Sequence, residues 1–307
     1  MRVLFYGTPA FSLPTLEALI GDHQVVAVVT QPDRPAHRGQ RLTASPVKER
    51  TRAAGIPLLQ PARLRDPEWP ERLREYGPEV GVVVAFGQIL PRTVLDVPAR
   101  GCLNVHASLL PRYRGAAPIA WAIIRGETET GISIMQMDES MDTGPVLCTS
   151  RTSIGPDETA ADLASRLATM GAEALLDVLS RLDCLAPLPQ AHAKATLAPR
   201  LKKNDGDIDW TRRARDLVNL VRGCNPWPGA YTRTPAGGLL IWKAGVLSEE
   251  TAEAPGTLVA HGTSLAVATS KGALLPLEVQ AEGRRVMPWN EYLRGARLAA
   301  GTTFGAR

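Results

Sequence analysis

The sequence predicts an α/β protein in two parts: a Rossmann-like, doubly wound and mainly parallel sheet, then a small C-terminal β-barrel of the OB-like kind. In the first half, short apolar runs rich in valine and isoleucine alternate with stretches of helical periodicity, which is typical of βαβ units. Beyond Trp210, short β-type runs are broken by Gly and Pro, as in small antiparallel barrels. A proline-rich stretch with little periodicity separates the two patterns.

The elements of the first half follow from composition and period. Five apolar runs have the residues and the length of strands, at 2–7, 25–30, 80–86, 102–106 and 132–137. Helical periodicity predicts helices near residues 14–21, 45–54 and 116–126. In a sheet built this way, ligands bind beyond the carboxyl ends of the parallel strands.

The clearest helix spans residues 159–182. Thr159 and Asp162 fit a capping box, and Gly155-Pro156 mark the turn before it. One apolar stripe at helical spacing comprises Leu163, Leu167, Met170, Ala174, Leu175, Val178 and Leu182. Such a stripe predicts packing against the core and not a cofactor site.

The domain boundaries follow from the stretch after Leu182, which is rich in proline and has little periodicity. We place a catalytic domain at residues 1–188, a linker at 189–207 and a β-barrel domain at 208–307. A helix is expected near 211–223, ahead of the β-type runs GAYTRT, LLIWKAGVL, GTLVAHG, SLAVATS and GALLPLEVQ. A chain of 307 residues is long enough for two domains.

Composition argues against several classes of protein. No apolar run reaches the length of about 18 residues that a membrane span needs, and MRVLFYGTPAF does not resemble a secretory signal, so we expect a cytoplasmic protein. We expect a monomer, although no sequence feature determines the oligomeric state. Four cysteines without a CxxC pair predict reduced thiols and no metal site. The first βα turn, YGTPAF, lacks the GxGxxG pattern, which argues against NAD.

Positive charge gathers in the C-terminal third. The chain has a net charge of +4, and residues 199–307 carry 15 Lys and Arg against 10 Asp and Glu. A second basic stretch runs from Arg34 to Arg52, with six Lys and Arg against one acid, Glu49. Surfaces of this kind bind phosphate, although a solvated basic surface and a disordered loop are the alternatives that composition leaves open.

Chemistry-bearing residues gather where the fourth apolar run ends. On a strand, Cys102, Asn104 and His106 point to one face. Cys102 and His106 are then about 13 Å apart, too far for a nucleophile and its base, whereas Asn104 and His106 are about 7 Å apart and can reach one substrate group. An asparagine inside an apolar strand is disfavoured, and a buried amide needs hydrogen-bond partners.

A polar loop supplies acids close by. In GISIMQMDESMDTGPVL, a β-type run ends near Met137 and the loop carries Asp138, Glu139 and Asp142. Asp142 is a candidate to orient His106 and favour its protonated form, although a turn aspartate and a surface histidine remain the alternatives. A metal site built from His106, Asp142 and Cys102 would lack HxH or HExxH spacing.

These motifs resemble those of the folate-dependent formyltransferases. NVHASLLPRYRGAAPI followed about 36 residues later by DESMDTGPV is similar to the family's site, and FYGTPAFSLPTL, TQPDRP and GCNPWPGAYT extend the resemblance over nearly the whole chain. The resemblance implies transfer of a formyl group from 10-formyltetrahydrofolate to the amino group of methionine on initiator tRNA. It also implies that Asn104, His106 and Asp142 are catalytic.

Binding residues are implied in the same way. The resemblance implies that the folate co-substrate is bordered by Ser108, Leu109, Leu110, Pro111, Phe86, Gly87, Gln88, Ile89 and Leu90. It implies tRNA contacts from Arg34, Arg38, Arg41, Lys48, Lys202 and Lys203. No metal is expected. In RLKKNDGDIDW the chain departs from the Lys-Glu-Glu-like run that we expect before Ile208, and the roles of Arg112 and Arg114 are left open.

An amide and an imidazole side by side suit this chemistry. An amine that attacks a formyl carbon makes a tetrahedral oxyanion, whose charge needs donors fixed in a dry site. Asn104 and protonated His106 would supply those donors, and Asp142 would hold His106 and take a proton from the amine. The alternatives are a formyltransferase for glycinamide ribonucleotide or an amino sugar nucleotide, a formylfolate hydrolase, and a non-catalytic RNA-binding protein.

Overall fold

The computed structural model describes residues 1–36, 41–247 and 252–305, and these residues group into two compact units. The N-terminal unit comprises Met1–Pro118, Glu129–Ser153 and Ala164–Pro199, and the C-terminal unit comprises Ile119–Thr128, Ile154–Leu163 and Arg200–Arg307. The units cut across the boundaries drawn from the sequence, since two short internal segments group with the C-terminal chain. Residues 189–199, expected as linker, belong to the N-terminal unit.

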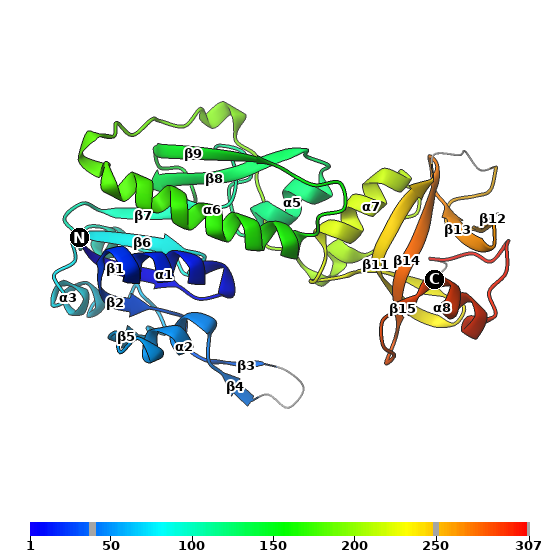
Figure 1. Ribbon diagram of the computed structural model, residues 1–307, viewed down its shortest axis with the longest axis horizontal. Helices are drawn as coiled ribbons and strands as arrows, with labels where there is room; N and C mark the ends of the chain where they lie inside the picture. The colour runs from blue at the N-terminus through cyan, green and yellow to red at the C-terminus, as the bar shows by residue number, and fades with distance from the viewer. Residues whose placement is uncertain (37–40, 248–251, 306–307) are drawn as a thin grey trace. The chain divides into compact units, whose positions relative to one another are not determined.

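The N-terminal unit is built on a seven-stranded sheet (Figure 1). Its strand order is β5 (Leu58–Leu59), β2 (Gln24–Val29), β1 (Arg2–Gly7), β6 (Val80–Val84), β7 (Cys102–His106), β8 (Glu129–Gln136) and β9 (Val146–Ser153). The first five strands are parallel, whereas β8 is antiparallel to β7 and β9 is antiparallel to β8. The predicted Rossmann-like, mainly parallel sheet is confirmed.

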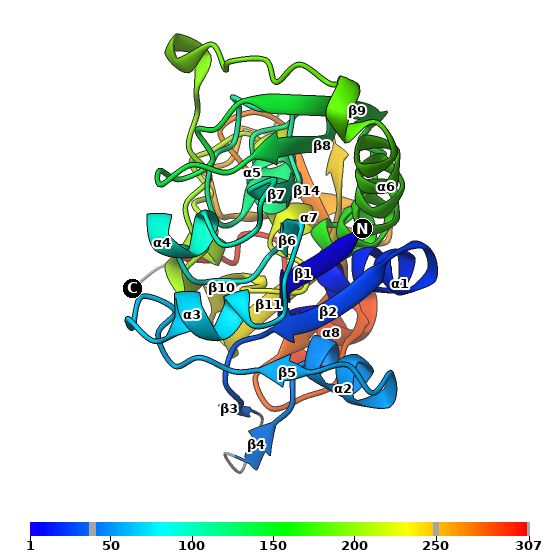
Figure 2. The ribbon, with the colours of Figure 1, turned by 90° about the vertical axis from the view of Figure 1, so that its left-hand side faces the viewer.

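Helices cover both faces of this sheet. In the N-terminal unit they are α1 (Leu13–Asp22), α2 (Pro46–Ala53), α3 (Trp69–Arg74), α4 (Arg92–Leu95) and most of α6 (Ala160–Ser180), whereas α5 (Pro118–Ile124) groups with the C-terminal unit from Ile119 onward. Figure 2 shows α1, α2 and α6 on one face and α3 and α4 on the other. The sheet is therefore doubly wound, as predicted.

Two packing contacts decide which face of β7 carries the candidate site. Val105 points toward α6, where a Cβ on Gly171 would lie 2.7 Å from Cγ1 of Val105. Cys102 points the other way, into a buried cluster that includes Trp69 of α3 and Leu95 of α4. Asn104 and His106 share the face of Cys102, so the site lies on the α3–α4 side of the sheet.

The C-terminal unit is an antiparallel sheet with two helices. Its strand path is β10 (Ala230–Thr234), β11 (Gly237–Leu247), β14 (Ala273–Ala281), β13 (Ser264–Ala268) and β12 (Leu258–His261), and β15 (Met287–Pro288) is added on β14. Helix α7 (Ala214–Gly223) packs on β11 and β14, and α8 (Trp289–Ala296) packs on β14. The predicted β-type second domain is confirmed as an antiparallel sheet, and at the two ends of its path Tyr231 of β10 accepts from the N–H of Ile208 and Leu258 of β12 donates to the carbonyl oxygen of Thr302.

Several elements escaped the sequence analysis for physical reasons, and β5, β9 and α8 are examples. β5 has only two residues, and the edge strand β9 reads VLCTSRTS, a polar sequence whose side chains alternate outward. Helix α8 spans eight residues and has a short apolar stripe, in which Trp289, Tyr292 and Leu293 are buried. Elements this short carry too few periods for a pattern to be recognised.

The remaining segments are a hairpin and a chain of short turns. β3 (Arg34–Ala36) pairs with β4 (Arg41–Thr43) outside the main sheet. Between α6 and α7, the chain forms the 3-10 turns η2 (Leu182–Cys184), η3 (His192–Lys194) and η4 (Lys203–Gly206). Among the helices described, none combines the length and apolarity needed to cross a bilayer.

The capping box at the start of α6 is confirmed and gives a test of the fold. The backbone N–H of Thr159 donates to Asp162 Oδ2 at 3.0 Å, and the N–H of Asp162 donates to Thr159 Oγ1 at 3.3 Å. Hydrogen bonds from the side chain and backbone of Thr159 lower the pKa of Asp162. A lowered aspartate pKa stabilises the fold above the ordinary aspartate value of about 4 and loses this effect as pH falls.

Thr159→Ala should therefore lower the free energy of unfolding by about 1 kcal/mol at pH 7. The difference from the unaltered chain should shrink as pH falls below about 4 and through the lowered pKa of Asp162. Thermal unfolding at pH 7 and at a pH below about 4 measures the difference in stability. Ser180→Ala, at the exposed end of α6, is the control. Equal melting temperatures of Thr159→Ala and the unaltered chain at pH 7 would contradict the cap.

Candidate active site

The candidate site is centred on one carboxylate that three groups approach. Asp142 Oδ1 lies 3.3 Å from Asn104 Nδ2 and 3.6 Å from His106 Nδ1. Asp142 Oδ2 accepts a hydrogen bond from the backbone N–H of Gly115 at 2.8 Å. The three side chains predicted from the sequence as a catalytic set therefore converge at one point, on the face of β7 opposite α6.

Burial gives this cluster a low local polarity. The side chains of His106 and Asp142 are 6% and 14% exposed, and Asn104 is half-buried. Charges in such a place interact more strongly than in water. A group that enters the site would therefore meet a dry set of donors next to a carboxylate.

The turn at residues 113–115 orients both His106 and Asp142. His106 Nε2 lies 3.0 Å from the backbone carbonyl oxygen of Tyr113. Because a carbonyl oxygen only accepts, Nε2 carries a proton and Nδ1 is the nitrogen that faces Asp142. Two residues further on, the N–H of Gly115 holds the other side of the Asp142 carboxylate.

Glycine is required at position 115 for two reasons. Its φ is +122°, a conformation that L side chains rarely adopt, and a Cβ there would lie 2.6 Å from the carbonyl oxygen of Ala198. Asp142 itself has a left-handed φ of +54°, and Tyr113 one of +59°. Positive φ at non-glycine residues often marks functional sites, and here two such residues meet around His106.

Cys102 takes no part in this cluster. Burial raises the pKa of its thiol to about 12, so the thiol is neutral, and its Sγ contacts the carbonyl oxygen of Leu95 at 3.8 Å. A neutral, buried thiol is not a nucleophile. The inference from strand spacing that Cys102 and His106 form no catalytic pair agrees with this placement.

The 108–111 segment is pinned beside His106. Ser133 Oγ on β8 donates to the carbonyl oxygen of Ser108 at 2.7 Å and accepts from the N–H of Leu110 at 3.1 Å. Ser108 Oγ donates to the carbonyl oxygen of Arg112 at 2.6 Å. The segment is thus held from both ends, with Leu109, Leu110 and Pro111 half-buried.

Residues 86–90 follow β6, the strand next to β7. Phe86 and Leu90 are buried, and the carbonyl oxygen of Phe86 accepts from Thr8 Oγ1 and Gln31 Nε2. Gln88 donates to the carbonyl oxygen of Pro61, while Gly87 and Ile89 are exposed, Ile89 to 76%. A large apolar side chain this exposed beyond a parallel strand is a candidate ligand contact.

The residues expected to contact tRNA are divided by the structure. Arg38 lies outside the described residues, and Arg34 and Arg41 lie in β3 and β4, where the backbone alone is described. Lys202 and Lys203 are exposed at η4. Lys48 is buried, with its Nζ 2.5 Å from Asp33 Oδ2, so we remove Lys48 from the proposed set.

Several supporting residues were given no role from the sequence, although Arg114 was noted there. Tyr113 and Gly115 act through backbone groups, and Ser133 lies in the middle of a strand. Arg114 and Gln190 are buried and bonded to each other. Only Gly115, a glycine in a loop of bulky residues, could have been singled out.

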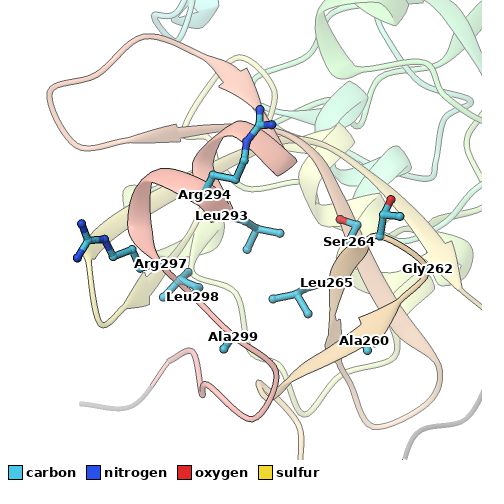
Figure 3. A pocket seen from close by; sticks show the side chains of 10 residues that line it. Ala260, Gly262, Ser264, Leu265, Leu293, Arg294, Arg297, Leu298 and Ala299 are labelled. Carbon is cyan, nitrogen blue, oxygen red and sulfur yellow. The ribbon is translucent and has the colours of Figure 1, made fainter.

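A hollow lies on the C-terminal unit. Figure 3 shows this open space of about 580 Å³, between the turn that joins β12 to β13 and the end of α8. Leu265, Leu293 and Leu298 line it, while the side chains of Arg294 and Arg297 extend outward at its edge. It has no acid or histidine, so the cluster on β7 is the candidate active site. Over residues 1–36, 41–247 and 252–305, no group of three His, Cys, Asp or Glu could hold a metal ion.

Comparison with known proteins decides the family. Residues 1–179 match the family described as "Formyl transferase", and residues 200–297 match "Formyl transferase, C-terminal domain". The chain belongs to the formyltransferase family. Residues 1–179 of this formyltransferase include every residue of the Asn104–His106–Asp142 cluster.

Relatives extend the match to nearly the full length of this formyltransferase. It is 49% identical over 310 residues to a methionyl-tRNA formyltransferase of Sorangium cellulosum, covering 99% of this chain and 100% of the relative. It is 47% identical over 304 residues to the protein of that name from Myxococcus xanthus, covering 98% and 97% of the two chains.

Solved structures share the fold. An N-formyltransferase from Helicobacter canadensis, in complex with folinic acid and dTDP-3-aminofucose, aligns with a TM-score of 0.66 at 15% identity over 90% of this chain and 98% of that one. HypX from Aquifex aeolicus, in complex with tetrahydrofolic acid, aligns with a TM-score of 0.63 at 18% identity over 98% of this chain and 48% of that one. At these identities the likeness shows the fold.

Gly115→Ala should disturb the Asp142 carboxylate without changing any side chain of the Asn104–His106–Asp142 cluster. The added Cβ would force the backbone away from Ala198, and with it the N–H that holds Asp142 Oδ2. Displacement of a catalytic group by about 1 Å can cost about 100-fold in rate, so we expect kcat for formyl transfer to fall about 10- to 100-fold.

The matched control is Gly21→Ala in α1, where a new Cβ meets no atom within 4 Å. Steady-state kinetics on both variants, with melting temperatures, make the comparison. A Gly115→Ala enzyme with unchanged kcat would show that the Gly115 N–H does not hold the carboxylate where it is needed.

Proposed function

We propose that this protein transfers the formyl group of 10-formyltetrahydrofolate to the α-amino group of methionine esterified to initiator tRNA, and that it works as a cytoplasmic monomer. The observation that carries the proposal is the convergence of Asn104 and His106 on the carboxylate of Asp142, within 3.6 Å. Methionyl-tRNA formyltransferases 45–49% identical over nearly the whole chain support the choice of substrate.

The protein must assist this reaction in two ways. Attack of the amine nitrogen on the formyl carbon forms a C–N bond and a tetrahedral oxyanion, and the amine loses a proton. Collapse of this intermediate breaks the bond from carbon to N10, which takes up a proton, and releases tetrahydrofolate. The site must therefore stabilise an oxyanion and transfer a proton.

Asn104 and His106 supply the oxyanion donors. The bond from Asn104 Nδ2 to Asp142 Oδ1 is long at 3.3 Å, so a developing oxyanion can compete for this N–H. His106 has its Nε2 proton committed to the Tyr113 carbonyl, which leaves an Nδ1 proton of the imidazolium as the second donor. Both donors are preorganised by the strand and the 113–115 turn, which is the arrangement that lowers a barrier most.

Asp142 serves as the acceptor of the proton. Its Oδ1 lies 3.6 Å from His106 Nδ1, and its side chain is 14% exposed. An α-amino group has a pKa near 8, so a nearby carboxylate assists loss of the proton once the C–N bond begins to form. No covalent bond to the enzyme is required.

The folate co-substrate fits the surface between the two loops. Residues 108–111 are held in place directly after His106, and the exposed Ile89 follows the neighbouring strand β6. An apolar, partly aromatic ligand is best held by such side chains. We propose that Ser108, Leu109, Leu110, Pro111, Phe86, Gly87, Gln88 and Ile89 border it.

For tRNA we propose three basic surfaces. The β3–β4 hairpin and its connection carry Arg34, Arg38 and Arg41, η4 carries Lys202 and Lys203, and the C-terminal unit carries the remaining positive charge. The ion pair of Lys48 with Asp33, together with Gln60 Nε2 bonded to Asp33 Oδ1 at 3.0 Å, anchors the base of the hairpin. Lys48 therefore supports the arginines instead of binding RNA.

Formyl transfer with different acceptors tests the proposal. Methionyl initiator tRNA should be formylated in the presence of 10-formyltetrahydrofolate, whereas glycinamide ribonucleotide and amino sugar nucleotides should not. Asn104→Ala should lower the single-turnover rate about 100- to 1,000-fold, the usual cost of one oxyanion donor. Formate release without an acceptor, or a near-normal rate for a folded Asn104→Ala enzyme, would refute the proposal.

Salt dependence tests the hairpin. If Arg41 contacts a phosphate, Arg41→Ala should weaken binding of charged tRNA and lower the slope of log affinity against log salt by about one. Formylation at 0.15 M salt should fall accordingly. Arg65→Ala, at an exposed arginine outside the hairpin, is the control. An unchanged slope and rate for Arg41→Ala would remove the hairpin from the tRNA-binding surface.

A further inference from the structure

The segment after α6 runs along the N-terminal unit as a strap, which we define as residues 188–198. Leu188 and Val146 exchange backbone hydrogen bonds of 2.8 and 2.9 Å. At the other end, the N–H of Arg114 donates to the carbonyl oxygen of Thr196, and the N–H of Ala198 donates to that of Arg114 at 2.7 Å. The strap is thus bonded to the loop that contains Asp142 and to the turn that contains Gly115.

Gln190 is the side chain by which the strap reaches the Asp142 loop. It is 7% exposed. Its Nε2 donates to the carbonyl oxygens of Asp142 at 3.0 Å and Gly144 at 2.7 Å. Its Oε1 accepts from Arg114 Nη2 at 2.6 Å and from Arg114 Nε at 3.2 Å. Every donor and acceptor of this buried carboxamide is used.

Arg114 fixes which way round the carboxamide lies. The guanidinium is 7% exposed and also bonded through Nη2 to His192 Nδ1 at 3.0 Å. Because an arginine only donates, it must face the carboxamide oxygen, which turns the NH₂ group toward the Asp142 loop. Arg114 and His192 therefore select the one orientation of Gln190 that bonds the loop.

We propose that Gln190 is a positioning residue for the reaction, holding residues 142–144 so that the Asp142 carboxylate meets His106 and Asn104. Asp142 has a left-handed backbone conformation, which is unfavourable for an aspartate without outside support. The inference rests on the proposed catalytic role of Asp142. It assigns the strap a part in catalysis besides that of connecting two domains.

Gln190→Glu separates this role from general stability. The carboxylate keeps the shape of the side chain and its bonds to Arg114, but it places an oxygen opposite the carbonyl oxygens of Asp142 and Gly144. Two acceptors repel each other, so the loop is released while the strap remains paired. We expect kcat to fall about 10- to 100-fold, as for other residues that orient a catalytic group. The KM for 10-formyltetrahydrofolate and the KM for methionyl initiator tRNA should change little.

A double-mutant cycle with Asp142→Asn shows whether the effect passes through Asp142. Single-turnover rates are measured for the unaltered enzyme, Gln190→Glu, Asp142→Asn and the double variant. We expect Gln190→Glu to cost at least 10-fold in the unaltered enzyme and less than threefold in the Asp142→Asn enzyme. Equal losses in both backgrounds, or a loss below twofold in the unaltered one, would overturn the proposal.

Two controls keep the result interpretable. The first control is Gln280→Glu. Gln280 also uses both ends of its carboxamide, since it accepts from Trp242 Nε1–H and donates to the carbonyl oxygen of Arg284. This variant should leave kcat unchanged. If Gln190→Glu does not fold, Gln190→Leu goes through the same cycle with the same criteria. A near-normal rate for Asp142→Asn would instead refute the proposed function, so the two failures are distinguishable.

Discussion

One carboxylate organises the chemistry of this protein. Asp142 accepts from the Gly115 N–H through one oxygen, and its other oxygen faces the donors of Asn104 and His106. These contacts come from two parts of the chain, since Asn104 and His106 lie on β7 and Gly115 lies in the turn that follows it. The parallel sheet places Asn104 and His106 on one face, but the loop at 142–144 must fold back over that face, because β8 runs antiparallel to β7 and ends beside its beginning.

The groups that hold Asn104, His106 and Asp142 in place are mainly backbone groups. The carbonyl of Tyr113 sets the tautomer of His106, the N–H of Gly115 holds Asp142, and the hydroxyl of Ser133 bridges both ends of the Ser108–Leu110 turn. A site supported in this way tolerates change in many side chains while its geometry is kept. The position that requires a small residue is Gly115, because a Cβ there would collide with the carbonyl oxygen of Ala198.

The sequence predicted those parts of the molecule in which residue type and period carry the information. The strands at residues 2–7 and 102–106 are confirmed at their predicted bounds, as is the cap at Thr159 and Asp162. Asn104 was conspicuous because an amide is out of place in an apolar strand. Gln190 was not, since its role depends on tertiary contacts with residues 46 to 76 positions away. Lys48 was misjudged because its local sequence is basic, whereas its environment is set by Asp33.

The path of the chain after α6 bears on where this enzyme can be divided. The formyltransferase family match ends at residue 179, and a fragment cut there would keep Asn104, His106 and Asp142. It would lose the hydrogen bonds that residues 188–198 make to the Asp142 loop and to Arg114. A minimal, separately expressed catalytic fragment must therefore extend to at least Ala198, since a compact sheet and an intact set of reactive side chains do not by themselves make the site complete.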